Sequence, residues 1–180
     1  MSDSKYLTFR TMDLSRHADV AIACRRDAYR VTTGSDRRFD ETIGSAAYLK
    51  WLSNRIKCSP LGQVHVWRGH EIIGQIEARP QRNDSERGCV NLYYLMPRWR
   101  GRGLGSALDQ YVTSYFQSLG IKYLSLNVNQ MNHRAYHFYL ARGWTVTGPT
   151  PGVDSQLRME KELNQLRHCL PDTCDRVGLS

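Results

Sequence analysis

The sequence predicts an α/β domain built on a mixed, mostly antiparallel sheet with helices on both faces. Two short strand patterns flank Gly69-His70 within residues 63–78, which is a hairpin signal. Residues 104–119 carry apolar side chains at helical spacing. The strands before and after that helix are then joined by a right-handed crossover, which makes them parallel. Antiparallel hairpins and one parallel pair together define the mixed sheet.

Length and composition favour one soluble globular domain. The chain has 180 residues, of which 41% are hydrophobic and 23% charged, so we expect a domain over residues 1–163 and a loosely ordered tail over 164–180. No apolar run is long enough to span a membrane, and the N-terminus lacks the apolar segment of a secretory signal. Five scattered cysteines with no CxxC pair predict a reduced, cytoplasmic protein without a metal site.

The N-terminal part predicts one strand and two helices. Residues 6–12 form the strand, and Asp13 or Ser15 can cap a helix that runs to about Tyr29. The polar segment 31–41 has turn chemistry and predicts a loop. A second helix is expected over residues 42–58.

The remaining elements follow from apolar spacing and from the positions of glycine and proline. Strands are expected at 63–68, 71–78, 89–96, 123–129, 144–147 and 156–162, with a polar connector at 79–88. The clearest helix spans residues 104–119 and ends before Gly120, which suits the C′ position. A shorter helix is expected from the N-cap Asn132 to Arg142.

The most informative segment is MPRWRGRGLGSAL, residues 96–108, between a strand and a helix. Its arginines and glycines are Arg98, Arg100, Gly101, Arg102, Gly103 and Gly105. Glycines leave backbone N–H groups uncovered, and the helix start adds free N–H donors and the positive end of its dipole. The segment therefore predicts a site for a diphosphate or similar anion. It lacks the GK[ST] ending of a P-loop and does not fit GxGxxG.

Two motifs give the chain a resemblance to a known family. The pattern R-G-x-G-x-G at residues 100–105 resembles motif A of the GNAT family of N-acetyltransferases, where this loop holds the pyrophosphate of acetyl-CoA. Residues 126–144 resemble motif B of that family, L-x-V-x-x-x-N-x-x-A-x-x-F-Y-x-x-x-G-[FW], at every position. The resemblance is specific over residues 63–163 and extends only as element order to residues 6–60.

The resemblance implies a GNAT-like fold splayed between its fourth and fifth strands and direct acetyl transfer to an amine in a ternary complex. The backbone N–H of Leu95 would stabilise the oxyanion, and Tyr139 would protonate the departing thiolate. Packing in the core is the alternative for each residue; the motif favours the general-acid role for Tyr139, and Leu95 could serve both roles. The implied cofactor-binding residues are Leu95, Met96, Arg100, Gly101, Arg102, Gly103, Leu104, Gly105, Ser106, Asn132, Ala135 and Tyr139.

The base that accepts the amine proton is open. Glu77 is the strand carboxylate in the implied region, although it could instead be a salt-bridged structural residue. His65 and a chain of water molecules are the alternatives. His133 and His137 have zinc-ligand spacing, but no third ligand lies nearby in the sequence, so we expect surface residues and no metal.

Three functions from different classes fit the sequence. The first is an acetyl-CoA-dependent N-acetyltransferase, monomeric or homodimeric, acting on the amine of a small molecule or peptide. The second is a catalytically degenerate sensor that binds acyl-CoA. The third is a basic nucleic-acid-binding module, which the absence of a predominantly basic helix disfavours.

Net charge bears on the acceptor. Lys and Arg number 25 against 17 for Asp and Glu, a formal charge of +8. Five of these cations cluster in and after the first helix: Arg25, Arg26, Arg30, Arg37 and Arg38. We therefore expect an acceptor that is neutral or carries a carboxylate or phosphate. Asp36, Asp40 and Glu41 in the same segment could reverse that preference locally.

Overall fold

A single seven-stranded sheet organises the computed structural model, which describes residues 7–35 and 37–163. The expected tail, 164–180, lies outside the described residues. The strands are β1 Leu7–Thr11, β2 Gln63–Arg68, β3 Glu71–Gln81, β4 Asp84–Leu95, β5 Tyr123–Asn129, β6 Thr145–Thr150 and β7 Val153–Glu162. The α-helices are α1 Leu14–Thr33, α2 Arg37–Thr42, α3 Ser45–Cys58, α4 Gly105–Ser118 and α5 His133–Leu140.

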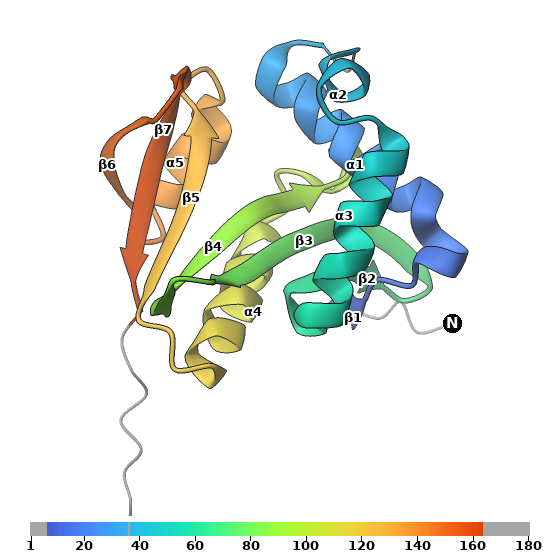
Figure 1. Ribbon diagram of the computed structural model, residues 1–180, viewed down its shortest axis with the longest axis horizontal. Coiled ribbons are helices and arrows are strands. Elements are labelled where there is room, and N and C mark those ends of the chain that lie inside the picture. The colour runs from blue at the N-terminus through green and yellow to red at the C-terminus, as the bar shows by residue number, and fades with distance from the viewer. Residues whose placement is uncertain (1–6, 36, 164–180) are drawn as a thin grey trace, which may run out of the picture.

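The mixed α/β architecture is confirmed. The strand order is β1-β2-β3-β4-β5-β7-β6, and every neighbouring pair is antiparallel except β4 and β5. Helices α1 and α3 cover one face of the sheet, and α4 and α5 lie on the other (Figure 1). Among the described residues, no helix has the length and apolar character needed to cross a membrane.

Helix α4 forms the predicted amphipathic element and builds the main core. Leu108, Val112 and Phe116 are buried against the sheet, as the apolar spacing required. Gly120 adopts a φ of 72°, which lets the chain leave the helix in the left-handed conformation expected at C′. Near the N-terminus, Asp13 caps α1 by accepting a hydrogen bond from the Ser15 N–H at 3.0 Å.

The prediction of a loop over residues 31–41 was wrong except at Gly34 and Ser35, which lie between two helices. Helix α1 continues to Thr33 and ends at Gly34, whose φ is 77°, and α2 follows at Arg37–Thr42. Phe39 of α2 is fully buried and packs edge-on against the rings of Tyr29 and Tyr48. Long-range burial of one aromatic side chain therefore overrides the local turn signals.

The polar connector predicted at 79–88 is also wrong in part. Strand β3 continues to Gln81 and β4 begins at Asp84, so β3 and β4 form one long hairpin. The polar residues there lie on a sheet surface that is only partly covered. Hydrogen bonding between the two strands holds the segment extended although its composition resembles a loop.

Candidate active site

A cavity opens where the two parallel strands separate. Strands β4 and β5 pair only along residues 87–89 and 123–125. Beyond Cys89, β4 continues beside β3 and β5 continues beside β7, so the strands diverge. Asn91 is an extra residue on β4 opposite the step from Glu77 to Ala78, and such a bulge bends a strand. The gap holds a cavity of about 440 Å³ bordered by α1, β4, β5, α5 and the glycine loop.

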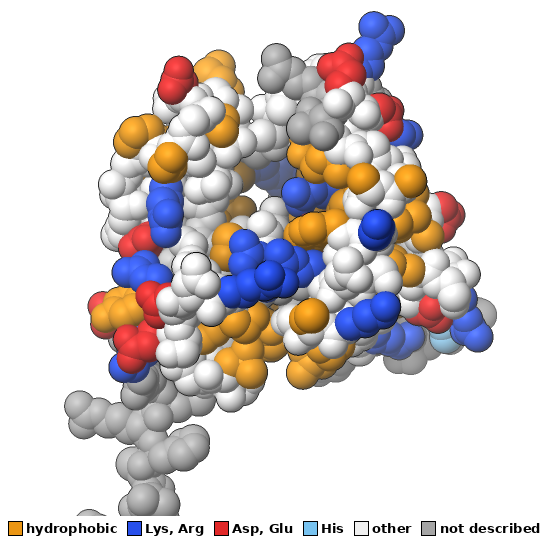
Figure 2. Space-filling model, in the orientation of Figure 1, with side chains coloured by type: hydrophobic (Ala, Val, Ile, Leu, Met, Phe, Trp, Pro, Cys, Tyr) orange, Lys and Arg blue, Asp and Glu red, His pale blue; other side chains and the backbone are white. Residues whose placement is uncertain are grey.

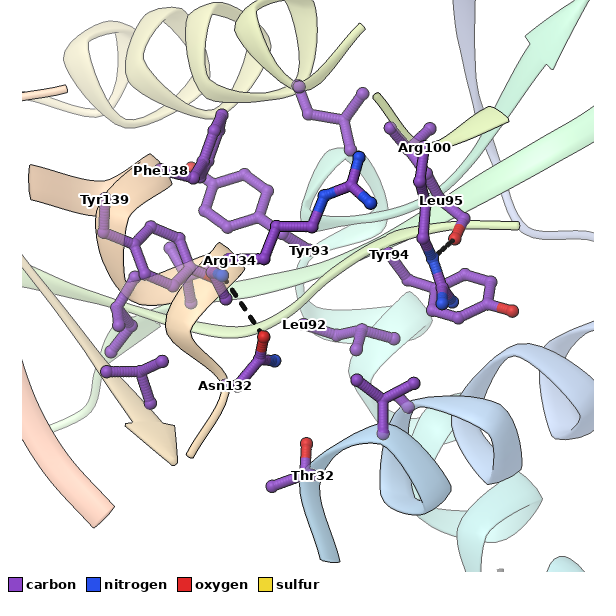
Figure 3. A pocket seen from close by; sticks show the side chains of 18 of the residues that line it. Thr32, Leu92, Tyr93, Tyr94, Leu95, Arg100, Asn132, Arg134, Phe138 and Tyr139 are labelled. Carbon is purple, nitrogen blue, oxygen red and sulfur yellow. Dashed lines mark hydrogen bonds between the residues drawn. The ribbon is translucent and has the colours of Figure 1, made fainter. Parts of the chain in front are cut away.

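The edge of β4 presents unpaired backbone groups to this cavity. The Met96 N–H donates to the Ile73 carbonyl on β3 at 2.9 Å. Backbone groups alternate in direction along an antiparallel strand, so the N–H groups of Leu95 and Tyr93 point away from β3 and into the gap. The Leu95 carbonyl accepts a hydrogen bond from Arg100 Nε at 2.7 Å (Figure 3). The position assigned to Leu95 thus offers a free donor, and Tyr93, which sequence reasoning missed, offers a second.

Met96, one of the implied cofactor-binding residues, is not among the residues that line the cavity. Its N–H is already bonded to β3, and its side chain packs against the buried cluster of Cys24, Leu92 and Tyr94 under α1. The strand alternation that frees Leu95 is the reason, because successive residues face opposite ways.

The glycine loop is built as an anion cradle. Gly101 and Gly103 have φ values of 78° and 76°, a conformation that favours glycine. Within the described part of the chain, the N–H groups from Gly101 to Gly105 have no acceptor. Gly105 packs so closely on the Phe138 ring that a Cβ there would lie 2.6 Å from it. Leu104, Gly105 and Ser106, three of the implied cofactor-binding residues, also line the cavity.

The loop arginines are more structural than the sequence suggested. Arg98 pairs with Glu71, and Arg102 lies over the Trp99 ring at 5.1 Å without lining the cavity. Arg100 lines the cavity but is held by Leu95 and by Asp27 of α1, whose carboxylate lies 2.6 Å from its guanidinium.

Two other arginines, Arg134 and Arg142, reach the cavity from the opposite side. Arg134 belongs to α5, Arg142 follows two residues after that helix ends at Leu140, and both line the cavity. An ideal Cβ on Gly101 would lie 2.9 Å from a terminal nitrogen of Arg134, so this guanidinium covers the loop. Arg142 donates to the Ser106 hydroxyl. The sequence separates them from the loop by roughly 30 to 40 residues, and the packing of Phe138 of α5 on Gly105 at the start of α4 brings the two segments together.

Helix α5 carries the remaining predicted groups. Asn132 caps it by accepting from the Ala135 N–H at 3.2 Å. Figure 3 shows Asn132 and Tyr139 on the same side of the cavity, facing Leu95 and Arg100 across it. Asn132, Ala135 and Tyr139 all line the cavity.

Tyr139 is buried yet its hydroxyl is unbonded. No described residue hydrogen-bonds this hydroxyl, whereas its ring packs against Tyr93, Phe138 and Trp144 at centroid distances of 6.0, 5.4 and 5.9 Å. Burial, reinforced by the negative charge of Asp109, raises the pKa of Tyr139. The phenol is therefore protonated at neutral pH and able to donate.

A buried polar cluster centred on Asp109 supports the Tyr139 ring. Asp109 of α4 pairs with Lys161 of β7 at 2.8 Å. It also accepts hydrogen bonds from the Tyr93 hydroxyl and the Trp144 indole N–H, both at 3.4 Å. Tyr93 and Trp144 are two of the rings packed on Tyr139, so the cluster fixes its surroundings.

Sequence comparison decides the family. The model of the acetyltransferase (GNAT) family matches residues 26–144, about two thirds of the chain. The chain belongs to the GNAT family. A comparison with curated proteins finds no match.

Several solved structures share the fold at low sequence identity. The PaiA N-acetyltransferase of Thermoplasma acidophilum, solved in complex with coenzyme A, is 19% identical with a TM-score of 0.72, and the match covers 87% of this chain and 99% of that one. Ard1 of Thermoplasma volcanium is 18% identical with a TM-score of 0.69, covering 88% and 98%. YncA of Salmonella typhimurium, solved with its cofactor acetyl-CoA, is 19% identical with a TM-score of 0.66, covering 94% and 100%.

In this GNAT domain, neither candidate base reaches the cavity. Glu77 is fully buried between the sheet and α3. Its carboxylate accepts from Tyr48 at 2.7 Å and Gln75 at 2.8 Å and pairs with Arg25 at 3.2 Å. His65 is also buried, and desolvation lowers its pKa to about 4. Neither residue lines the cavity, and no Asp, Glu or His is among the described residues that do.

The histidines of α5 do not form a metal centre in the described structure. His133 and His137 are both exposed. Within residues 7–35 and 37–163, no group of three or more His, Cys, Asp and Glu side chains is placed to hold a metal ion.

Proposed function

We propose that the protein is an acetyl-CoA-dependent N-acetyltransferase that transfers acetyl directly to a primary amine in a ternary complex. One observation carries the proposal: a single cavity joins the uncovered N–H groups of the glycine loop, the free edge of β4 and the Tyr139 hydroxyl. Acetyl-CoA, when bound, would supply a thioester carbonyl and a thiolate leaving group. These three features are the groups that such a reaction requires.

The residues fit acetyl-CoA from one end of the cavity to the other. The N–H groups of Gly101 to Gly105, at the start of α4, would bind the diphosphate. Arg134 and Arg142 would add positive charge there. The unpaired edge of β4 would hydrogen-bond the extended pantetheine arm as a neighbouring strand would. Asn132, at the cavity wall, would contact the same arm.

Two groups would act on the reacting atoms. The N–H of Leu95 or of Tyr93 would donate to the oxygen on which negative charge develops. The Tyr139 hydroxyl, protonated and unbonded, would donate to the departing sulfur.

The amine must lose a proton, and Glu77 remains our candidate for the group that accepts it. Its position behind the cavity wall means that water would carry the proton to the carboxylate. His65, neutral at physiological pH because its pKa is lowered, is the second candidate. Release of the proton directly through water is the third.

An acyl-CoA-binding sensor without turnover is the second candidate function. One observation favours it: no described carboxylate or imidazole lines the cavity. Both candidates require acetyl-CoA binding, and only the enzyme requires thiol release in the presence of an amine.

Thermal shift tests the binding that both functions share. Acetyl-CoA at about 100 times its Kd stabilises the folded state by about 2.7 kcal/mol, or about 5–10 °C in Tm for a domain of this size. Gly103→Glu should abolish the shift, because the space around a Cβ at Gly103 is open and the new carboxylate would enter the anion cradle.

Gly120→Glu is the matched control for backbone strain. Gly120 also has a positive φ, 72°, and open space around a Cβ, but it lies at the far end of α4. If acetyl-CoA still raised the Tm of Gly103→Glu by the full amount, the assignment of the glycine loop as the diphosphate-binding site would be refuted. A screen of amines with thiol release as the readout then separates enzyme from sensor.

A further inference from the structure

Three arginines gather on the face covered by α1 and α3, outside the site described above. They are Arg55 near the end of α3, Arg79 on β3 and Arg82 in the turn after β3. The charges of Arg79 and Arg82 are close enough to Arg55 to contribute to lowering its pKa, together with its burial. Figure 2 shows Lys and Arg side chains at the centre of this face, over the β3–β4 hairpin and below the hollow between α1 and β5.

The charge of this arginine cluster, Arg55, Arg79 and Arg82, is not neutralised within the described structure. None of the three has an acidic partner among the described residues. The acids of the neighbouring hairpin are already paired, Asp84 with Arg87 and Glu86 with Lys122. The Arg79 Nε is buried without a hydrogen-bond partner. Like charges held together without a counter-ion repel, so an anion would stabilise the cluster.

The arginines in and after α1, which the sequence analysis singled out, do have acidic partners in part. Three of them are paired with acids: Arg25 with Glu77, Arg26 with Asp40 and Arg30 with Asp27. The surplus charge on this face therefore centres on the hairpin and not on α1.

The cluster lies where the cavity begins. Arg79 is directly opposite Cys89 in the β3–β4 register, and the next two residues of β4, Val90 and Asn91, line the cavity. The side chain of Gln81 reaches across to Ser125 of β5, donating to its hydroxyl at 3.3 Å. The hairpin thus abuts the point at which β4 and β5 diverge.

The spacing to the reacting groups sets a length for the ligand. Cys89 and Tyr93 are four residues apart on an extended strand, which corresponds to about 13 Å. Tyr93 packs against Tyr139, so the reacting centre lies close to the position of Tyr93 along β4. Guanidinium groups match carboxylates and phosphates in geometry and charge.

We propose that Arg55, Arg79 and Arg82 bind an anionic group, carboxylate or phosphate, of the amine acceptor, held on the order of 10 Å from the reacting amine. This inference rests on the proposed function, because it names the class of molecule that the enzyme acetylates. A free amino acid is too short to span that distance. A peptide with an acidic side chain, or a phosphorylated conjugate of similar length, fits it.

A binding experiment tests the cluster without any turnover. Inorganic phosphate is titrated into the protein in the Gly103→Glu background, which disables the glycine loop, and tryptophan fluorescence is recorded. Arg55 lies over the Trp51 ring at 5.4 Å, so occupancy should change the Trp51 signal, and Trp51→Phe identifies that signal. Arg79→Gln and Arg82→Gln should each weaken phosphate binding about tenfold.

Arg16→Gln is the control for net charge. Arg16 is on α1 with its side chain 79% exposed, and its change removes the same charge away from the cluster. Arg82 is exposed, so Arg82→Gln should fold normally and the test does not depend on Arg79→Gln alone. Phosphate affinity that the cluster variants alter no more than Arg16→Gln does would overturn the inference.

A kinetic experiment tests the acceptor class. The amine panel includes matched peptides, Ala-Ala-Glu amide against Ala-Ala-Gln amide and Ala-Ala-Lys amide, and phosphorylated against unphosphorylated Ala-Ala-Ser amide. The anionic member of each set should have the higher kcat/KM. Arg79→Gln should remove that preference through KM, with kcat nearly unchanged.

The outcomes separate the two proposals. Acetylation without an anionic preference, or a preference that survives Arg79→Gln, overturns the inference and leaves the proposed function standing. No acetylation of any amine, with phosphate binding that depends on the cluster, removes the proposed function and with it the acceptor assignment. Preferential binding of a short RNA with no acceptor preference also overturns the inference.

Discussion

Substitution of Tyr139 by phenylalanine separates catalysis from packing. The change removes one hydroxyl and keeps a ring that contacts Tyr93, Phe138 and Trp144. A general acid contributes about 10²–10⁴-fold to a rate, so kcat for acetyl transfer should fall by that factor. Acetyl-CoA binding should be almost unaffected, since the loop and the edge of β4 are intact.

The stability change in this variant should be small. The hydroxyl has no hydrogen-bond partner among the described residues, so its loss should alter the free energy of unfolding by less than about 1 kcal/mol. For a domain of this size that is less than about 4 °C in Tm. Removal of the whole ring by Tyr139→Ala should cost about 3–5 kcal/mol, because it leaves a cavity in the core.

The assay measures single-turnover and steady-state thiol release, with Tm recorded in parallel. Tyr136→Phe is the control, because Tyr136 is half-buried on the same helix and does not line the cavity. A normal single-turnover rate in Tyr139→Phe would refute the general-acid role. A Tm loss close to that of Tyr139→Ala would show that the hydroxyl serves packing instead.

Three further predictions concern buried groups. If Glu77 is the base, Glu77→Gln should lower kcat about 100-fold or more, with the acetyl-CoA thermal shift retained. An unchanged kcat with a lower Tm would mean that Glu77 is structural. Asp109→Asn should lower the unfolding free energy in urea by about 3 kcal/mol, because it leaves the largely buried Lys161, whose side chain is 15% exposed, without its partner. Asp109→Asn with Lys161→Met should recover part of that loss. Burial lowers the pKa of His65 from 6.5 to about 4, so the folded state holds the imidazole neutral. The unfolding free energy should therefore decrease as the pH falls from 6.5 to about 4, because only the unfolded chain binds a proton there. Above pH 6.5, His65 should have no effect on the pH dependence. Denaturant titrations across pH 4–7 on His65→Gln should show a flatter dependence, and an identical dependence would contradict the assignment.

Local signals predicted most of the fold correctly. The apolar spacing of Leu108, Val112 and Phe116 predicted α4, and Gly120 marked its end. Asn132 caps α5 as its position before that helix suggested. These features depend on backbone geometry within one turn, which a short stretch of sequence specifies.

The errors arose where distant contacts decide the local structure. Helix α2 is stabilised by burial of Phe39 against Tyr29 and Tyr48, and the β3–β4 hairpin is extended by pairing between strands. Nothing in the adjacent residues encodes either contact. Tertiary burial and strand pairing outweigh local propensity in both segments.

By itself the sequence determined the glycine loop and the strand–helix–strand crossover around it, since each is a short pattern with a local physical cause. It singled out Tyr139 only through the resemblance of residues 126–144 to a family motif. Only the tertiary structure decided which arginines face the cavity. Arg98 pairs with Glu71 and Arg102 lies over the Trp99 ring, whereas Arg134 of α5 and Arg142, just after that helix, reach the loop. The tertiary structure also placed Glu77 behind the cavity wall and left Arg55, Arg79 and Arg82 without acidic partners in the described structure. A side chain's charge is written in the sequence, but its partners depend on which elements the fold packs together.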